Sequence, residues 1–163
     1  HGGSIRYYIK KKSNKNLKIN NNVKKQIQNE IKYGLHKFKT YKKFSNNVQR
    51  SRKNLLKILQ KIKNNGKKIA GYGATAKAVT ILNYCNINKD LIQNFIDITP
   101  EKINRYMPGK KIKILKYNRN ILNNYDYIFL GAWNFKEEIF NKEKKFIKRG
   151  GKFITHIPQP KII

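Results

Sequence analysis

Residues 67–85 read Lys-Lys-Ile-Ala-Gly-Tyr-Gly-Ala-Thr-Ala-Lys-Ala-Val-Thr-Ile-Leu-Asn-Tyr-Cys, and this stretch decides the fold. A short apolar run ends at Gly71, and a segment whose apolar residues recur at helical spacing begins directly after the glycines. A change of this kind is typical of a strand, a tight turn and a helix in succession. The sequence therefore predicts a strand near Lys68–Gly71 and a helix over about Thr75–Asn86.

Three small residues in this stretch, Gly71, Gly73 and Ala76, fit the pattern G-x-G-x-x-G/A. In that pattern the first glycine makes the turn, the second lets a pyrophosphate approach the backbone, and the third allows helix and strand to pack. Free N–H groups at the helix start, together with the helix dipole, would then face an anion. We expect a phosphate-bearing ligand here, held by Gly71, Tyr72, Gly73, Ala74, Thr75 and Lys77.

Lys77 is a cation in the first turn of the predicted helix. A positive charge opposes the helix dipole at this end and is locally unfavourable. This unfavourable interaction with the helix dipole suggests that Lys77 pairs with a phosphate or with Asp97.

The formal net charge is +30, from 38 Lys and Arg against 8 Asp and Glu. Such a field attracts nucleic acid, anionic membranes or anionic ligands without specifying which. The charge is nearly all lysine, and Lys, Asn and Ile together form roughly half of the chain in an even spread. Codons for these residues are rich in A and T, so a bias in base composition explains the charge. We therefore expect no specific nucleic-acid binding and no membrane binding.

The sequence also indicates the setting of the protein. No apolar run is long enough to span a membrane, and no signal peptide opens the chain. The single cysteine, Cys85, excludes an intramolecular disulfide and a cysteine-rich zinc site, and its place on the apolar helix face indicates core packing. We expect a cytoplasmic protein with no metal site in this chain. Because the sequence opens at His1 within a motif-like His-Gly-Gly-Ser, we also expect a piece of a longer protein.

Residues 1–65 are expected to form a linking strand and a helical segment. Ile5–Ile9 has the β-branched and aromatic content of a strand, and Lys10–Asn22 reads as a loop. A helix follows from Val23, with Gly34 as its C-cap. A long amphipathic helix then covers Leu35–Asn65, with a packed apolar stripe and a solvated lysine face.

Residues 66–163 alternate strands with helices, which predicts a Rossmann-like domain. After the first strand and helix, further strands are predicted at Ile92–Ile98, Lys111–Leu115, Tyr125–Leu130 and Lys152–Ile157. A helix over Phe135–Lys148 precedes the last of them. This alternation predicts an α/β fold with a doubly wound, mainly parallel sheet of about five strands. The nearly all-apolar Tyr125–Leu130 is expected at its centre.

Ligands of such sheets bind at the carboxyl ends of the strands, which brings further residues to the glycine turn. Asp97 follows the second strand, where an acid meets a ribose hydroxyl in dinucleotide folds, and it is equally well explained as a turn former. Trp133, the only tryptophan, is expected to form a wall for a base or sugar ring, and Asn134 to cap the next helix. His156 and His1 are the credible acid or base groups.

Further motifs follow the glycine stretch in a fixed order. Gly-Tyr-Gly-Ala-Thr-Ala-Lys continues into Leu-Asn-Tyr-Cys, and is followed by Asp97-x-x-Pro-x-Lys, Met107-Pro-Gly, Trp133-Asn with Glu-Glu-Ile, and Gly151-Lys-Phe-Ile. In this order the chain resembles the C-terminal domain of S-adenosylmethionine-dependent sugar C-methyltransferases, which methylate C3 of nucleotide-linked 4-keto deoxysugars. The opening His-Gly-Gly-Ser-Ile-Arg is similar to the segment that joins the family's methyl-donor domain to this one. The resemblance covers nearly the whole chain.

The resemblance implies a division of labour with parts upstream. In the family, an N-terminal zinc-binding region and a middle domain that binds S-adenosylmethionine precede this part, while the Rossmann-like domain anchors the nucleotide diphosphate sugar. A base removes the proton next to the ketone, and the enolate carbon then attacks the donor methyl group. The family's principal catalytic candidates lie upstream of His1. We therefore expect this chain alone to be inactive, with His1 the one catalytic candidate within it.

Two other functions suit parts of the sequence. The glycine motif and Asp97 are also compatible with an NAD(P)-binding domain of an oxidoreductase. The positive charge is compatible with a basic nucleic-acid-binding module.

Overall fold

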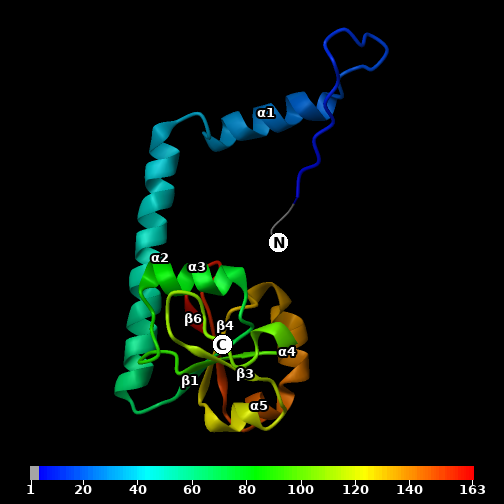
Figure 1. Ribbon diagram of the computed structural model, residues 1–163. Coiled ribbons are helices and arrows are strands. Elements are labelled where there is room, and N and C mark those ends of the chain that lie inside the picture. The colour runs from blue at the N-terminus through cyan, green and yellow to red at the C-terminus, as the bar shows by residue number, and fades with distance from the viewer. Residues whose placement is uncertain (1–3) are drawn as a thin grey trace. The chain divides into compact units, whose positions relative to one another are not determined.

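The computed structural model describes residues 4–163, which divide between Val48 and Gln49 into two compact units. The first unit contains α1 (Asn21–Tyr33) and the start of α2 (Phe38–Asn64), and the second contains the remainder of α2 and a sheet (Figure 1). The division falls inside α2 rather than at residue 65. The reason is that the second half of α2 buries Leu55, Leu59 and Ile62 in the core of the sheet unit.

The first unit departs from the sequence prediction in two respects. The predicted strand at Ile5–Ile9 is wrong: among residues 4–163 this segment pairs with no strand, and its apolar side chains are exposed. A strand needs a partner for its backbone groups, and β content alone does not supply one. The predicted apolar stripe of the long helix is also exposed over the first part of α2, at Phe38, Tyr41 and Phe44.

Helix α1 ends as the sequence predicts. Gly34 adopts a left-handed conformation with φ of 74°, and its N–H bonds to carbonyl groups of the last turn. No residue of α1 is buried, although its apolar residues are spaced for one face.

The second unit is built on a six-stranded sheet in the order β3-β2-β1-β4-β5-β6. Strands β1 to β5 run parallel, and β6 lies antiparallel to β5. The strands are β1 (Ile69–Tyr72), β2 (Asn94–Asp97), β3 (Lys113–Lys116), β4 (Tyr127–Leu130), β5 (Lys152–Thr155) and β6 (Lys161–Ile162). The predicted Rossmann-like, mainly parallel sheet is confirmed, with one strand more than expected because the chain turns back along β5.

Helices cover both faces of this sheet (Figure 1). The second half of α2 and α3 (Ala76–Cys85) cover one face, where Leu59, Leu82 and Phe95 have no exposed surface. Helices α4 (Lys136–Lys142) and α5 (Lys144–Lys148) cover the other face through Ile139 and Phe146. Cys85 is buried in the first cluster, as predicted.

Strand β4 lies between β1 and β5, and its residues Ile128, Phe129 and Leu130 are fully buried. The apolar run therefore marks the central strand, as expected. Three short 3₁₀ helices complete the unit: η1 (Pro100–Lys102), η2 (Ile121–Asn124) and η3 (Trp133–Phe135).

The single helix predicted over Phe135–Lys148 is interrupted. It comprises the end of η3, then α4 and α5, with Glu143 between the last two at φ −102° and ψ 28°. Asn134 lies inside η3, and the N-cap of α4 is Phe135, so the predicted capping role of Asn134 is wrong. Glu143 leaves the helical conformation where its side chain is buried beside Tyr72.

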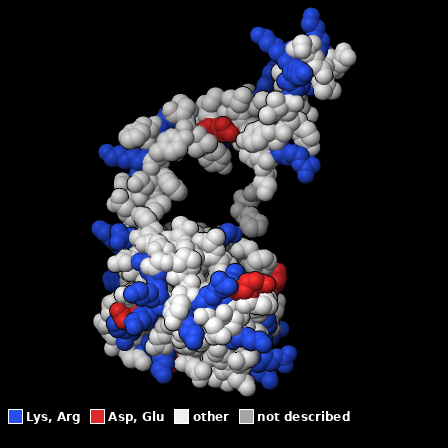
Figure 2. All heavy atoms as spheres, in the orientation of Figure 1, with Lys and Arg blue, Asp and Glu red and all other residues white. Residues whose placement is uncertain are grey.

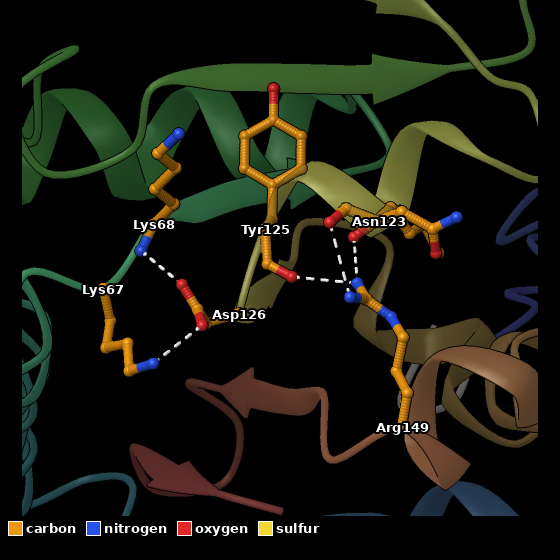
Figure 3. Close-up of polar contacts among 7 residues, drawn as sticks. Lys67, Lys68, Asn123, Tyr125, Asp126 and Arg149 are labelled. Carbon is orange, nitrogen blue, oxygen red and sulfur yellow. Dashed lines mark hydrogen bonds and ion pairs between the residues drawn. The ribbon is translucent and has the colours of Figure 1, made fainter.

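Asp126 and Arg149 secure the end of the sheet opposite the glycine turn (Figure 3). The Asp126 carboxylate accepts the Lys68 N–H at 2.9 Å and the Lys67 ammonium at 3.1 Å, which ties the start of β1 to the start of β4. The Arg149 guanidinium donates to the carbonyls of Leu122, Asn123 and Tyr125. These contacts hold the amino-terminal ends of the strands together and leave the carboxyl ends to form a site.

The small residues of the glycine motif have roles different from those expected. Gly71 lies inside β1, and a Cβ there would come within 2.4 Å of the Phe95 ring, so Gly71 serves close packing rather than the turn. Gly73 makes the turn, with φ of +85°. Ala76 is exposed, and the small residue beneath the helix is the fully buried Ala78. The strand, turn and helix are therefore confirmed, whereas the roles of Gly71 and Ala76 are corrected.

This packing makes the effect of Gly71→Ala predictable. The added methyl group overlaps the buried Phe95 ring, so we expect the free energy of unfolding to fall by about 2 kcal/mol, measured by urea denaturation. Phe95→Leu removes the overlapping ring atoms. The double variant should therefore lose less stability than the sum of the losses in the two single variants. A loss equal to that sum would contradict this packing role.

Candidate functional site

Asp97, at the end of β2, braces the glycine turn. Its Oδ2 accepts the Ala74 N–H at 2.7 Å and lies 3.5 Å from the Lys102 ammonium, while its Oδ1 accepts the Thr99 N–H at 2.8 Å. The side chain is buried, which alone would raise its pKa. The hydrogen bonds from Thr99 and Ala74, with the charge of Lys102, outweigh burial and hold the pKa of Asp97 below its ordinary value.

The backbone N–H groups of the turn are largely engaged within the protein. The N–H of Gly73 donates to Ile96 O at 2.8 Å, that of Ala74 donates to Asp97, and that of Thr75 donates to Gly73 O at 2.9 Å. These three amides are therefore not available to an anion, whereas the expectation for the N–H groups at the start of α3 stays a prediction.

Thr75 joins the start of α3 to the end of β4. Its Oγ1 accepts the Ala78 N–H at 3.1 Å, as an N-cap, and donates to Gly131 O at 3.0 Å. A Cβ at Gly131 would come within 2.3 Å of Gly73 O. The loops after β1 and β4 therefore touch and form one wall of a site.

A cavity of about 340 Å³ opens at the carboxyl ends of β1, β2 and β4. Apolar and aromatic side chains form most of its surface, and Lys102, Lys142, Asp97 and Glu138 supply charge. Its lining residues are Tyr72, Gly73, Thr75, Ile96, Asp97, Ile98, Thr99, Lys102, Tyr117, Ala132, Phe135, Glu138, Ile139 and Lys142. An apolar cavity with a few charged groups at this edge of a parallel sheet is typical of a small-molecule site.

A second cavity of about 330 Å³ adjoins the first and shares Phe135 and Glu138 with it. Trp133 and Asn134 line this second cavity together with Thr155. The Lys77 ammonium lies 5.0 Å from the centre of the Trp133 ring, within the range of a cation–π contact.

The predicted site residues thus gather at one edge of the sheet. Tyr72, Gly73, Thr75 and Asp97 line the first cavity, and Trp133 and Asn134 line the second. Gly71 and Ala74 are buried beneath the turn, and Lys77 lies beside Trp133. His1 lies outside the described residues.

Sequence reasoning missed Lys102, Tyr117, Glu138 and Lys142 of the first cavity. Tyr117 follows directly after β3, so the rule for carboxyl ends of strands would have found it if applied to every strand. Lys102 lies in the Asp97-x-x-Pro-x-Lys motif, which places it near Asp97 in the chain. No pattern among the many lysines distinguishes Lys142.

A buried acid, Glu143, stands behind the first cavity. It is 5% exposed, and its Oε1 accepts the Tyr72 hydroxyl at 2.9 Å. Burial, with Glu143 as the next cause, raises the pKa of Tyr72 well above its ordinary value and the pKa of Tyr117 to about 12. Glu143 lies with Ile139 and Phe146 at helical spacing, and an acid on that apolar face was an available signal.

His156, expected as an acid or base, is buried against the Phe129 ring, with ring centroids 5.2 Å apart. Burial lowers its pKa to about 4, so the imidazole is uncharged at neutral pH. It lines neither of the two cavities described.

Charge is spread widely over the surface, and Figure 2 shows Lys and Arg scattered over the visible face with few acids between them. Among residues 4–163, no group of three or more His, Cys, Asp and Glu side chains could hold a metal ion. Within the same residues, no helix is both long and apolar enough to cross a membrane.

The hydrogen bonds of Asp97 and of the glycine turn can be compared with those that an NAD(P)-binding domain needs. In a dinucleotide-binding fold, the acid after the second strand accepts a hydrogen bond from a ribose hydroxyl, and the backbone N–H groups of the glycine turn bind the pyrophosphate. Here both oxygens of Asp97 accept backbone N–H groups, and three turn amides are engaged. The site therefore fits a nucleotide cofactor poorly in that mode.

Comparison with known proteins identifies the family. Residues 1–158 match the family described as the C-methyltransferase C-terminal domain, and the chain belongs to this family. It is similar to the C-methyltransferase NovU of Streptomyces niveus, with 31% identity over 163 residues. The match covers 100% of this chain and 39% of that relative. The chain thus spans well under half of the length of the curated relative that it matches.

The bracing role of Asp97 leads to a pH-dependent prediction. Because the pKa of Asp97 is held below its ordinary value near ~4, its ionised form stabilises the fold above that pH, and this contribution is lost as the pH falls below it. Asp97→Asn should lower the free energy of unfolding by about 2 kcal/mol at pH 7, with a difference that shrinks in acid.

Chemical denaturation at several pH values measures this difference, and Asp90→Asn, at an exposed aspartate, is the matched control. A loss in Asp97→Asn that is equal at pH 7 and pH 3, or as small as that of the control, would contradict the bracing role.

Proposed function

We propose that this chain is the substrate-binding domain of an S-adenosylmethionine-dependent C-methyltransferase that acts on a nucleotide-linked 4-keto deoxysugar. The observation that carries the proposal is the cavity at the carboxyl ends of β1, β2 and β4, with aromatic walls and two lysines, in a chain of this family. The similar protein NovU is named as a C-methyltransferase, which supports methyl transfer to carbon.

The chemistry of the two cavities suits a ligand in two parts joined by an anion. Each cavity has a volume of roughly 330–340 Å³, at the lower end for a ligand site, and together they suit a larger molecule. Tyr72, Tyr117 and Trp133 offer rings to a base or a sugar. Lys102 and Lys142 offer ammonium groups to a diphosphate, in place of the turn amides that the protein itself uses.

The methyl donor and the base that forms the enolate are assigned to the part of the protein outside this chain. S-adenosylmethionine, when bound there, would supply the methyl group. The residues of this chain do not fit it at the glycine turn, because Asp97 and the turn amides are engaged. The contribution of this domain to catalysis is to hold the sugar in one orientation, which lowers the entropic cost of the reaction.

A thermal-shift comparison tests the proposal. A thymidine diphosphate sugar should raise the unfolding temperature of the chain more than NAD does at the same concentration, because only a bound ligand stabilises the folded state. Equal shifts, or no shift with either compound, would overturn the proposed substrate class.

Lys77→Ala tests the phosphate contact that the sequence predicts for this residue, which lies beside Trp133 of the second cavity. Loss of one charge-assisted contact should weaken binding of the nucleotide sugar about tenfold, as measured by calorimetry. The unfolding temperature of the unliganded protein should change little, since the Trp133 contact of Lys77 is not deeply buried. Lys89→Ala, at an exposed lysine beyond the C-terminal end of α3, is the control. Unchanged affinity in Lys77→Ala would remove Lys77 from the site.

A further inference from the structure

Two tyrosines of the first cavity contact one another, and one of them bonds to a buried acid outside the cavity. Tyr72 and Tyr117 both line the cavity, and their rings contact edge to face with centroids 5.9 Å apart. Behind them lies Glu143, buried between α4 and α5, with Oε1 2.9 Å from the Tyr72 hydroxyl. Burial, and after it the neighbouring Glu143, raise the pKa of Tyr117.

This arrangement fixes the direction in which the Tyr72 hydroxyl donates its proton. A tyrosine hydroxyl has a single proton and can also accept hydrogen bonds. The Tyr72 hydroxyl donates its proton to Glu143, so a ligand group that reaches the phenol oxygen from the cavity meets only lone pairs. Because Glu143 is 5% exposed, it is itself shielded from the ligand and acts through Tyr72.

Two lysines supply hydrogen-bond donors in the same cavity. Lys142 lies with its Nζ 3.8 Å from the centre of the Tyr117 ring, and Lys102 lines the cavity near Asp97. An ammonium group can only donate hydrogen bonds. The cavity therefore holds the Tyr72 acceptor together with cationic donors.

We propose that Glu143 is a specificity-determining residue, which turns the Tyr72 hydroxyl into an acceptor and selects a ligand with an N–H or O–H donor close to an anionic group. A pyrimidine nucleoside diphosphate has such a pattern, with an imide N–H, a ribose hydroxyl and a diphosphate. The inference rests on the proposed function, since it assigns the side chains that read the nucleotide of the same ligand. A group that only accepts hydrogen bonds would face lone pairs at the Tyr72 hydroxyl and is disfavoured.

Calorimetric titration of the chain with thymidine diphosphate, and with its 3-N-methyl and 3′-deoxy analogues, tests the proposal. At least one analogue should bind to the unaltered protein about tenfold more weakly than thymidine diphosphate does. The same analogue and thymidine diphosphate should bind to Tyr72→Phe with equal affinity, because this variant lacks the acceptor. Glu143→Gln should weaken thymidine diphosphate about tenfold, because the amide can donate to a phenol oxygen and compete with the ligand. Glu30→Gln, the same change at an acid of α1 that lines neither of the two cavities, should leave the affinity unchanged.

A readout without ligand separates this role from simple loss of structure. In Glu143→Gln, loss of the neighbouring acid should lower the pKa of Tyr117 from about 12, as followed by NMR of tyrosines labelled at Cζ. Binding of thymidine diphosphate with no effect of Tyr72→Phe or Glu143→Gln would overturn the inference and leave the proposed function intact. Failure of thymidine diphosphate and its sugars to bind the unaltered protein would overturn both.

Discussion

The hydrogen bond from the Ala74 N–H to the Asp97 carboxylate, 2.7 Å long, is the contact on which the site depends. It joins the turn after β1 to the end of β2 and aligns the two strands at their carboxyl ends. On the other side of the turn, Thr75 holds the end of β4 through Gly131. The three loops that surround the cavity are therefore fixed to one another by one buried and one part-buried hydrogen bond. A turn braced in this way needs no ligand to keep its shape.

The same bracing changes what the turn can bind. A glycine turn in a dinucleotide fold presents its amides to a pyrophosphate, whereas here the amides of Gly73, Ala74 and Thr75 bond to the protein. The positive groups that line the cavity are the side chains of Lys102 and Lys142. An anion bound here would therefore meet ammonium groups, while the Tyr72 hydroxyl donates its proton to Glu143 and can only accept hydrogen bonds from a ligand. The same fold can therefore bind a different ligand when its polar groups form different hydrogen bonds.

Much of the architecture could be predicted from the sequence because it depends on local patterns. The alternation of apolar runs and helical spacing gave the parallel strands, and Gly73 gave the turn. The strand at Ile5–Ile9 failed because β content does not provide a partner strand. The role of Gly71 depends on the Phe95 ring of a neighbouring strand, and the role of Asp97 on the Ala74 amide. Such contacts between distant residues leave little trace in a single sequence. Glu143 is an exception, because an acid on an apolar helix face is visible in the sequence.

The central claim is that a nucleotide diphosphate ligand binds at the carboxyl ends of β1, β2 and β4. Titration of the ¹⁵N-labelled chain with thymidine diphosphate, followed by NMR, tests it most directly, because each backbone amide reports its own surroundings. The account predicts that the signals that move lie in residues 72–77, 97–102, 117 and 132–142, which surround the two cavities. Signals that move mainly in α1, around Asp126 at the opposite end of the strands, or nowhere at all would contradict it.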